Sequence, residues 1–422
     1  MTRRPNEGMT GIAVAAGCVV VVLGAGLLLG GCSGTPRSRA EAEPARPTTS
    51  LTPRRSPTMD PFAARPGTIA ASHDEAPNFS LFGDTSPASA NDPIDGRNFD
   101  PTENIRQVSF ATEGADFDPA VSRDGNLLFF SSTRHRETAD IYVQAVDGAS
   151  VTQLTSDPAH DVMPAISPDQ QRIAFASNRN GSWDIYIMNA EGGQATQITS
   201  EPSHELHPTF SPDGRFLAYC RLSERSSRWE IWMVDLERPA VKTFLTFGLF
   251  PEWHPSADQL LFQRSRDRGN QFFSVWTVDV RNGESSRPTE VLSSSVAAII
   301  NPTWSPDGRF IACSTAFVPD GTAGDPSAPG SGGAFSSERP QFADIWLVSA
   351  DGQTRINLTG GWFVNTMPTW GARSELYFVS NRNGVDTVWS ISPEQGIRAA
   401  GMKPPRANRG VATAVETGED GQ

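Results

Sequence analysis

Positive charge is scarce in this sequence. Lys242 and Lys403 are its only lysines, and 48 acidic residues against 35 Lys and Arg give a formal net charge of -13 at pH 7. Proteins that bind nucleic acid usually gather Lys and Arg on one face to neutralise phosphates. The composition therefore argues against a nucleic-acid partner. The acidity is explained by solubility, with attraction of a cationic partner as the alternative.

Cysteine is also scarce. Four Cys in 422 residues are too few for a disulfide framework. Cys18 and Cys32 lie in the N-terminal apolar segment, whereas Cys220 and Cys313 each end a predicted strand in a different repeat. Equivalent strands of different repeats stand too far apart for disulfide geometry. We therefore expect Cys220 and Cys313 to be buried free thiols.

The chain has an apolar run from Ile12 to Leu29 that follows Arg3 and Arg4, which indicates an export signal. The run ends in Leu-Gly-Gly-Cys-Ser, which resembles the bacterial lipobox. The resemblance implies removal of residues 1–31 and lipid modification of Cys32. The protein would then be anchored outside the cytoplasm by acyl chains, most simply on the outer membrane facing the periplasm. An uncleaved transmembrane helix is the alternative, since about 18 apolar residues just span a bilayer.

Three segments are too polar or too simple in composition to bury a core. Residues 32–103 and 397–422 are rich in Pro, Ser, Thr, Ala and charged residues, which predicts a disordered N-terminal tether and a disordered C-terminal tail. Residues 318–341 form an insertion of Gly, Ser, Pro and Ala in the fifth repeat. Its low complexity favours disorder, and a functional loop is the alternative.

The rest of the chain contains a repeat. A proline, a short apolar stretch and a turn recur at intervals of 45, 44, 43, 51 and 66 residues. The six copies begin at Pro119, Pro164, Pro208, Pro251, Pro302 and Pro368. Propeller blades of WD type repeat at roughly 40 to 45 residues, one four-stranded sheet per repeat. The sequence therefore predicts an all-β fold, a six-bladed β-propeller of four-stranded antiparallel blades over residues 104–396.

Each copy carries the same strand signals. In Ser-Pro-Asp-Gly, as at residues 211–214, Pro presets φ and Gly supplies a positive φ, which predicts a tight turn. An apolar strand follows, then a polar hairpin, then a strand with Trp or Tyr at a constant position. We expect that aromatic row to fill the gaps between blades. Residues 106–111, which precede the first copy, are expected to complete the sixth blade and close the ring.

The succession of Ser-Pro-Asp-Gly, Ser-Asn-Arg-Asn-Gly, Asp-Ile-Tyr and Gln-Ile-Thr resembles the TolB-type propeller repeat, also called PD40 or WD40-like. The resemblance is weakest in copies four and six, which have Trp253-His-Pro-Ser-Ala-Asp and Gly371-Ala-Arg-Ser-Glu in place of Ser-Pro-Asp-Gly. It implies a propeller of the cell envelope that binds an envelope protein or polymer, such as a peptidoglycan-associated lipoprotein. TolB also has a separate N-terminal domain, which residues 33–103 are too polar to form. The fold therefore transfers by resemblance, and a role in a Tol system does not.

One catalytic motif that accompanies some similar propellers is absent from the sequence. No Gly-x-Ser-x-Gly nucleophile elbow occurs, which argues against a peptidase of the prolyl oligopeptidase type. We therefore expect a binding module without a cofactor rather than an enzyme. The alternative is a propeller enzyme with its site in the channel, a lyase or hydrolase of a small sugar or lactone. Such a site would be a few residues scattered over the blades and would leave no motif.

Candidate binding residues lie in or just after the loops that lead into the first strands of blades one to three. The segments 155–161 and 199–205 are equivalent, and each pairs a His with a carboxylate. Such a pair suits a divalent metal or acid–base chemistry, and the alternative is a polar rim that makes local turn bonds. Blades four to six offer no matching His, so no metal site is predicted. The predicted residues, expected at one mouth of the channel, are Asp116, Asp118, His160, Asp161, His204, Glu205 and His207.

Overall fold

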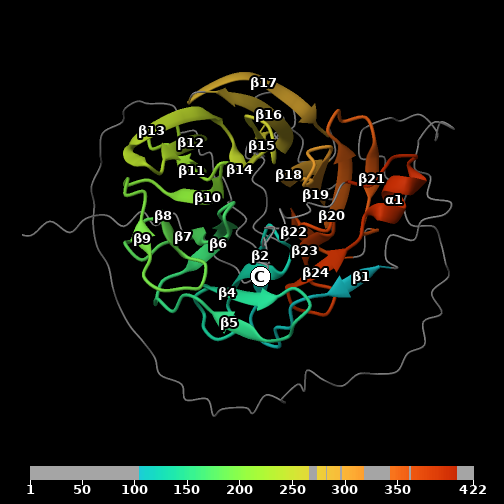
Figure 1. The fold of residues 1–422 in the computed structure, drawn as a ribbon, viewed down its shortest axis with the longest axis horizontal. Coiled ribbons are helices and arrows are strands. Elements are labelled where there is room, and N and C mark those ends of the chain that lie inside the picture. The colour runs from blue at the N-terminus through green and yellow to red at the C-terminus, as the bar shows by residue number, and fades with distance from the viewer. Residues whose placement is uncertain are drawn as a thin grey trace, which may run out of the picture. The chain divides into compact units, whose positions relative to one another are not determined.

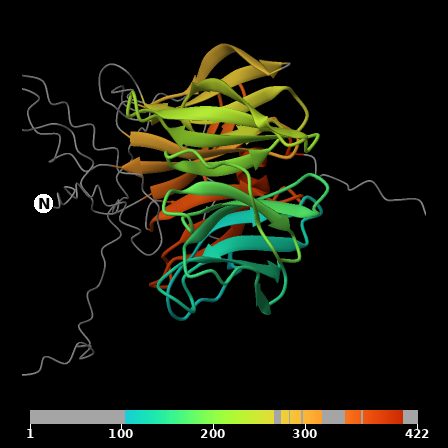
Figure 2. The ribbon, with the colours of Figure 1, turned by 90° about the vertical axis from the view of Figure 1, so that its left-hand side faces the viewer.

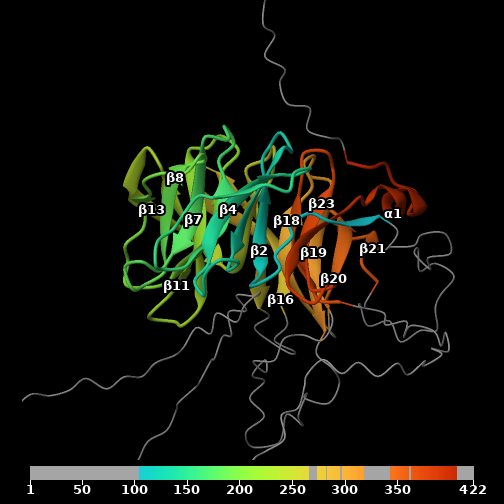
Figure 3. The same ribbon diagram turned by 90° about the horizontal axis from the view of Figure 1, so that it is seen from below.

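The structure is a computed structural model that describes residues 104–265, 273–281, 283–294, 297–317, 343–360 and 363–405. These residues form six four-stranded antiparallel sheets, arranged as blades around a central axis (Figure 1). Viewed from the side, the strands run between the two faces of the ring (Figures 2 and 3). The six-bladed β-propeller predicted from the repeat is confirmed.

The strands follow the repeat copies closely. Blade one contains β2 (Asp116–Val121), β3 (Leu127–Ser132), β4 (Asp140–Ala145) and β5 (Val151–Gln153). Blade two contains β6 (Asp161–Ile166), β7 (Arg172–Ser177), β8 (Asp184–Asn189) and β9 (Thr196–Gln197). Blade three contains β10 (Glu205–Phe210), β11 (Phe216–Leu222), β12 (Trp229–Asp235) and β13 (Arg238–Phe247).

Blades four to six complete the ring. Blade four contains β14 (Leu249–Trp253), β15 (Gln259–Ser265), β16 (Phe273–Arg281) and β17 (Glu284–Leu292). Blade five contains β18 (Ala297–Trp304), β19 (Phe310–Phe317), β20 (Ala343–Ser349) and β21 (Arg355–Asn357). Blade six contains β22 (Asn365–Trp370), β23 (Leu376–Ser380), β24 (Thr387–Ile391) and, from the N-terminal side, β1 (Ile105–Gln107).

Ser-Pro-Asp-Gly turns join the first and second strands of a blade. In blade three, Ser211 Oγ donates to Asp213 Oδ1, which also accepts the backbone N–H of Arg215 at 3.1 Å. Gly214 has φ of +71°, a conformation that glycine adopts without a steric penalty. The Ser–Asp bond recurs in blades one, two and five. These turns therefore form for the local reasons that the sequence motif indicated.

The aromatic row of the third strands is buried only in part. Tyr142 and Tyr186 are buried in the core. The four tryptophans of the row, Trp232, Trp276, Trp346 and Trp389, are half-buried. The guanidinium carbon of Arg221 lies 3.7 Å from the ring centroid of Trp232. All four tryptophans still pack against hydrophobic clusters that join neighbouring blades, as expected for this row, but part of each indole stays exposed.

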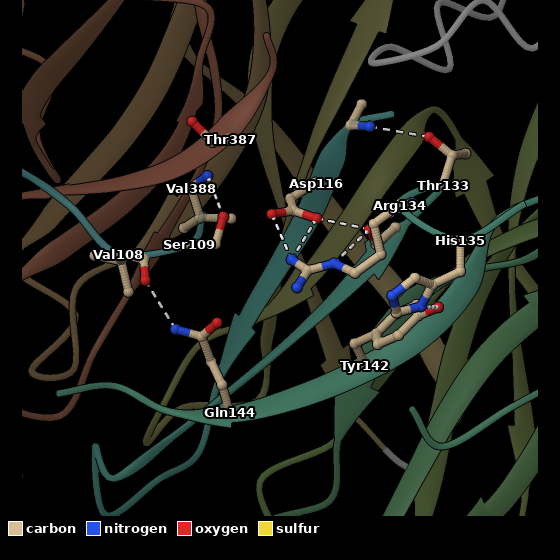
Figure 4. Close-up of polar contacts among 12 residues, drawn as sticks. Val108, Ser109, Asp116, Thr133, Arg134, His135, Tyr142, Gln144, Thr387 and Val388 are labelled. Atoms are coloured by element: carbon tan, nitrogen blue, oxygen red, sulfur yellow. Dashed lines mark hydrogen bonds and ion pairs between the residues drawn. The ribbon is translucent and has the colours of Figure 1, made fainter. Parts of the chain in front are cut away.

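Ring closure depends on the chain before the first blade. Strand β1 pairs antiparallel with β24. After β1, Val108 N donates to Val388 O at 2.9 Å, and Val388 N donates to Ser109 Oγ at 2.9 Å. The side chain of Gln144 in blade one donates to Val108 O at 2.8 Å (Figure 4). The predicted closure of the ring by this segment is confirmed.

The packed chain extends beyond residue 396, where the sequence placed the end of the propeller. Helix α1 (Glu394–Ala399) crosses that boundary and has Ile397 fully buried. Further along, the carbonyl of Pro405 accepts a hydrogen bond from Ser374 Oγ at 3.2 Å. The boundary of the predicted tail therefore moves to residue 405, because Ile397 adds apolar burial that the polar composition of the segment concealed. Residues 406–422 lie outside the described residues.

The two cysteines of the ring are free and buried, as predicted. Burial raises the pKa of both thiols, that of Cys313 to about 12. The predicted signal segment, the lipid site at Cys32, the tether and the insertion at 318–341 lie outside the described residues. Among the helical residues that the structure describes, none forms a segment of the length and apolarity that a bilayer crossing needs.

We expect Ser109→Ala to lower the free energy of unfolding by about 1 to 3 kcal/mol, because the buried N–H of Val388 then loses a hydrogen-bond acceptor. Urea denaturation followed by Trp fluorescence measures the change. Ser150→Ala, at an exposed serine of blade one, is the matched control and should leave stability unchanged. Equal stability of the two variants would contradict the assigned role of Ser109 in closure.

Candidate functional site

The first strands of the six blades surround the axis of the ring. Each contacts the first strand of the next blade, and β22 contacts β2 to complete the circle. We call the end where these strands begin the loop end, because the loops that connect the blades lie there. The opposite end, where the strands lead into the turns between first and second strands, is called the turn end. The predicted residues lie at the loop end or one step inside it.

Asp116 is held by an arginine of its own blade. Its two carboxylate oxygens accept hydrogen bonds from Arg134 Nη2 at 2.7 and 2.8 Å, and Ser132 Oγ donates to it at 2.6 Å (Figure 4). The Asp116 side chain is fully buried, and Arg134 is largely buried. Charge-assisted bonds of this kind are among the strongest in proteins. The carboxylate is therefore fully occupied within blade one.

The same arrangement recurs in blades two and six. Asp161 accepts two bonds from Arg179 Nη2, each at 2.9 Å, and Ser177 Oγ accepts from Arg179 Nε at 2.9 Å. In blade six, Asn365 Oδ1 accepts from Ser380 and Arg382. The Ser-x-Arg part of the repeat therefore ties the start of the first strand to the hairpin between strands two and three.

His160 and His204 connect neighbouring blades. His160 Nδ1 accepts the backbone N–H of Ala139 at 3.1 Å, and His204 Nδ1 accepts that of Trp183 at 3.3 Å. Burial lowers the pKa of both imidazoles, which favours the neutral form that can accept at Nδ1. The two histidines thus make equivalent structural bonds, each to the blade before their own.

Glu205 departs from the pattern. Glu205 begins its first strand at the position that Asp116 and Asp161 hold in blades one and two. The position of Arg134 and Arg179 in those blades is Ser223 in blade three, so Glu205 has no equivalent arginine partner. Ser203 Oγ donates to Glu205 Oε1 at 2.9 Å, and Oε2 is buried without a partner among the described residues. Burial raises the pKa of Glu205 to about 8.

Six residues one step inside the loop end share an unusual backbone conformation. Each directly precedes the repeat proline, and each has φ between 49° and 58° at a register shift of its strand pair. The residues are Asp118, Met163, His207, Phe250, Asn301 and Met367. A bulge with positive φ at a residue other than glycine is strained and re-aims a side chain. The strain is repeated around the whole axis.

Contacts within this ring cross from blade to blade. Asp118 Oδ2 accepts the backbone N–H of Met163 and the hydroxyl of Ser131, both at 3.2 Å. Burial raises the pKa of Asp118 to about 6. The rings of His207 and Phe250 lie 3.7 Å apart between centroids, and burial lowers the pKa of His207 to about 3. His207 is therefore a neutral packing residue, whereas Asp118 titrates near neutral pH.

A cavity of about 170 Å³ lies at the turn end, away from the predicted residues. Blades one, four, five and six line it, and its aromatic lining comes from Trp253, Trp304 and Trp370 at the ends of β14, β18 and β22. The sequence reasoning missed this site. Its signal was present, because Pro-x-Trp occurs in copies four, five and six, whereas copies one to three have Val, Ile and Phe in place of Trp.

Glu252 precedes Trp253 in β14 and is an ionisable residue in the cavity lining. Its equivalents in the other five blades are alanine or threonine, at positions 120, 165, 209, 303 and 369. Glu252 Oε1 accepts the backbone N–H of Trp304 at 3.0 Å and the hydroxyl of Thr303 at 3.1 Å. Burial outweighs these two bonds and raises the pKa of Glu252 to about 7.

Metal binding finds no support among the residues that the structure describes. No group of three or more His, Cys, Asp or Glu side chains there is arranged to hold a metal ion. The structure places two carboxyl groups with raised pKa values on first strands, Asp118 and Glu252, and the indole surfaces of three tryptophans at the turn end.

We expect Glu205→Gln to stabilise the fold at pH 8 more than at pH 5. The pKa of Glu205 is raised from 4.5 to about 8 in the folded state, so between these pH values the carboxyl ionises more readily in the unfolded state. The free energy of unfolding therefore falls as pH rises through that window, and replacing Glu205 with Gln removes this loss. Urea denaturation at the two pH values measures the effect. Glu224→Gln, at an exposed position of the same blade, is the control. An equal effect of Glu205→Gln at both pH values would contradict the raised pKa.

Comparisons with known proteins agree with this fold. The family described as TolB beta propeller domain (PD40) matches residues 101–282. No curated protein matches the chain. The similar solved structures include a candidate TolB from Agrobacterium tumefaciens, with 20% identity, 68% of this chain and 96% of that chain covered, and a TM-score of 0.49.

Two further solved structures are similar to this chain. TolB from Acinetobacter baumannii is 18% identical over 58% of this chain and 55% of its own, with a TM-score of 0.44. Oligogalacturonate lyase from Vibrio parahaemolyticus is 14% identical over 70% of this chain and 93% of its own, also with a TM-score of 0.44. The repeat and the six four-stranded blades identify the described part of this chain as a six-bladed β-propeller, and residues 101–282 match the TolB (PD40) propeller family.

Proposed function

We propose that this chain is an extracytoplasmic lipoprotein, anchored through Cys32, whose propeller binds an envelope protein or polymer at the turn end of its axis. A peptidoglycan-associated lipoprotein is one candidate partner. The observation that carries the proposal is the cavity of about 170 Å³ at that end. Its lining joins indole surface to one carboxyl group, and apolar surface with a few placed polar groups is the usual composition of a binding site.

The state of the loop end supports this choice. The carboxylates of Asp116 and Asp161 are bonded to arginines, and His160 and His204 each accept a backbone N–H. A ligand that engaged these atoms would have to replace internal hydrogen bonds, so little net free energy would be gained. We therefore assign these four residues to contacts within and between blades.

One observation favours an enzyme as the second candidate. Asp118 and Glu252 come from blades one and four, and burial raises their pKa values to about 6 and 7. Carboxyl groups with pKa values near the working pH suit general acid–base catalysis. A lyase or hydrolase of a small sugar or lactone would use such groups. Binding remains the first proposal, because Asp118 Oδ2 and Glu252 Oε1 are each occupied by two hydrogen bonds.

The two ends of the axis can be compared by photocrosslinking. Benzoylphenylalanine replaces Arg123, an exposed residue that lines the turn-end cavity, or Arg225, an exposed residue in the hairpin of blade three at the loop end. The full-length chain is expressed in its native envelope and irradiated. We expect crosslinked envelope protein or peptidoglycan fragments from the Arg123 variant, in at least about tenfold excess over the Arg225 variant.

Mass spectrometry of the crosslinked species identifies the partner. Trp304→Ala in the Arg123 variant should reduce the yield, because it removes part of the cavity wall. Crosslinks from position 225 alone would overturn the assignment to the turn end. Crosslinks from neither position, with the protein folded and exported, would count against a macromolecular partner and favour the channel-site enzyme.

A further inference from the structure

The turn-end cavity is small, and its tryptophans are largely buried. Trp253, Trp304 and Trp370 are each only 5% to 8% exposed, so they pack in the blades and present a small part of their surface to the cavity. A cavity of about 150 Å³ holds a single benzene-sized molecule. The cavity here, about 170 Å³, therefore suits one small group of a ligand rather than a whole chain.

The exposed parts of these indoles are carbon surface. Each Nε1 atom is inaccessible and has no hydrogen-bond partner among the described residues. The three rings thus offer the cavity no N–H donor for the hydroxyls of a sugar. Indole carbon surface carries the electron-rich π system that attracts cations.

Glu252 adds a carboxyl group at the same place. It lines the cavity, and both of its hydrogen bonds use Oε1. No positively charged side chain within the described part of the chain pairs with it. Burial of a carboxylate without a cationic partner is costly, so an entering cation would stabilise its charged form.

The remaining charged or titratable groups near the cavity are few. His254 follows Trp253 in the chain and packs edge-on against Trp304, with 4.8 Å between ring centroids. Burial lowers the pKa of His254, which favours the neutral form of its ring. Arg123 is exposed at the rim and comes from blade one. Glu252 is therefore the acidic group of the lining, and Arg123 favours a ligand that carries an anionic group beside its cation.

We infer that the turn-end cavity binds a cationic amine, with Glu252 as its counter-ion and the surfaces of Trp253, Trp304 and Trp370 around it. This inference rests on the proposed binding function and specifies its ligand. The amine can come from a lysine side chain of a partner protein or from a small zwitterionic amine of the envelope. Both sources present the same ammonium group to Glu252.

Calorimetric titration of the purified full-length chain tests the inference with defined probes. Nα-acetyl-lysine methylamide represents a protein side chain, phosphoethanolamine represents a zwitterionic headgroup, and Nα-acetyl-norleucine methylamide is the uncharged control. We expect binding of one or both amines and none of the norleucine compound. Affinity for the amine should be about tenfold weaker at pH 6 than at pH 8, because the ionised fraction of a group with pKa about 7 changes by that factor.

Variants connect the binding to the cavity. Glu252→Gln and Glu252→Thr should each abolish amine binding, and threonine already occupies the equivalent position in blades three, five and six, so the second variant is suited to fold. Glu191→Gln, at an exposed position of blade two, is the matched control. Unchanged amine affinity in both Glu252 variants, or tighter binding of the norleucine compound or of N-acetylglucosamine, would overturn the inference.

The titration and the crosslinking experiment can fail independently. Crosslinks at position 123 without amine binding would leave the proposed binding function standing and overturn the ligand class. Amine binding that depends on Glu252, without any crosslinked macromolecule, would support the ligand class and overturn the macromolecular partner. Preference for the lysine compound over phosphoethanolamine would support a protein partner, and the reverse preference would support a free envelope amine.

Discussion

The pairing of β1 with β24 is the interaction on which the rest of this structure depends. It brings a strand from before the first blade into the last blade, more than 280 residues later in the chain. Because β1 leads directly into β2, its pairing with β24 ties blade one to blade six and holds β2 beside β22. The closed circle of first strands is what creates an axis with two chemically different ends. A candidate site at either end therefore depends on hydrogen bonds at the rim, such as that between Val388 N and Ser109 Oγ.

Structural and functional residues separate according to how they repeat. The Asp–Ser–Arg arrangement of blades one and two returns with Asn365 in blade six, which marks it as part of the architecture. Glu252 and the tryptophans beside it occur only in part of the ring. Departures from a local rule without an obvious structural gain are where functional sites are expected. Glu205 is a second departure, and its cost is the burial of a carboxyl without its arginine.

Much of the fold was predictable, and much of the site was not. The period of the repeat and the Ser-Pro-Asp-Gly turns depend on local chemistry, since Pro, Asp and Gly each restrict a few backbone angles. The loop-end residues were predicted to lie near one another on the ring, and the structure places Asp116, His160 and Asp161 there in internal bonds. Their residue types suggested chemistry, but whether a carboxylate is free depends on its partner, and Arg134 lies 18 residues away from Asp116.

The sequence by itself determined the number of blades, the turns and the free thiols, because a short period repeated six times admits few arrangements of strands. Only the tertiary structure decided which polar atoms remain available. Blade-to-blade contacts occupy the Nδ1 atoms of His160 and His204, and closure of the ring gathers Trp253, Trp304 and Trp370 with Glu252 around one cavity. The physical reason is that a polar atom is available to a ligand only when no neighbouring group already bonds to it. Many of those neighbours come from other blades, and the sequence pattern within one repeat does not encode them.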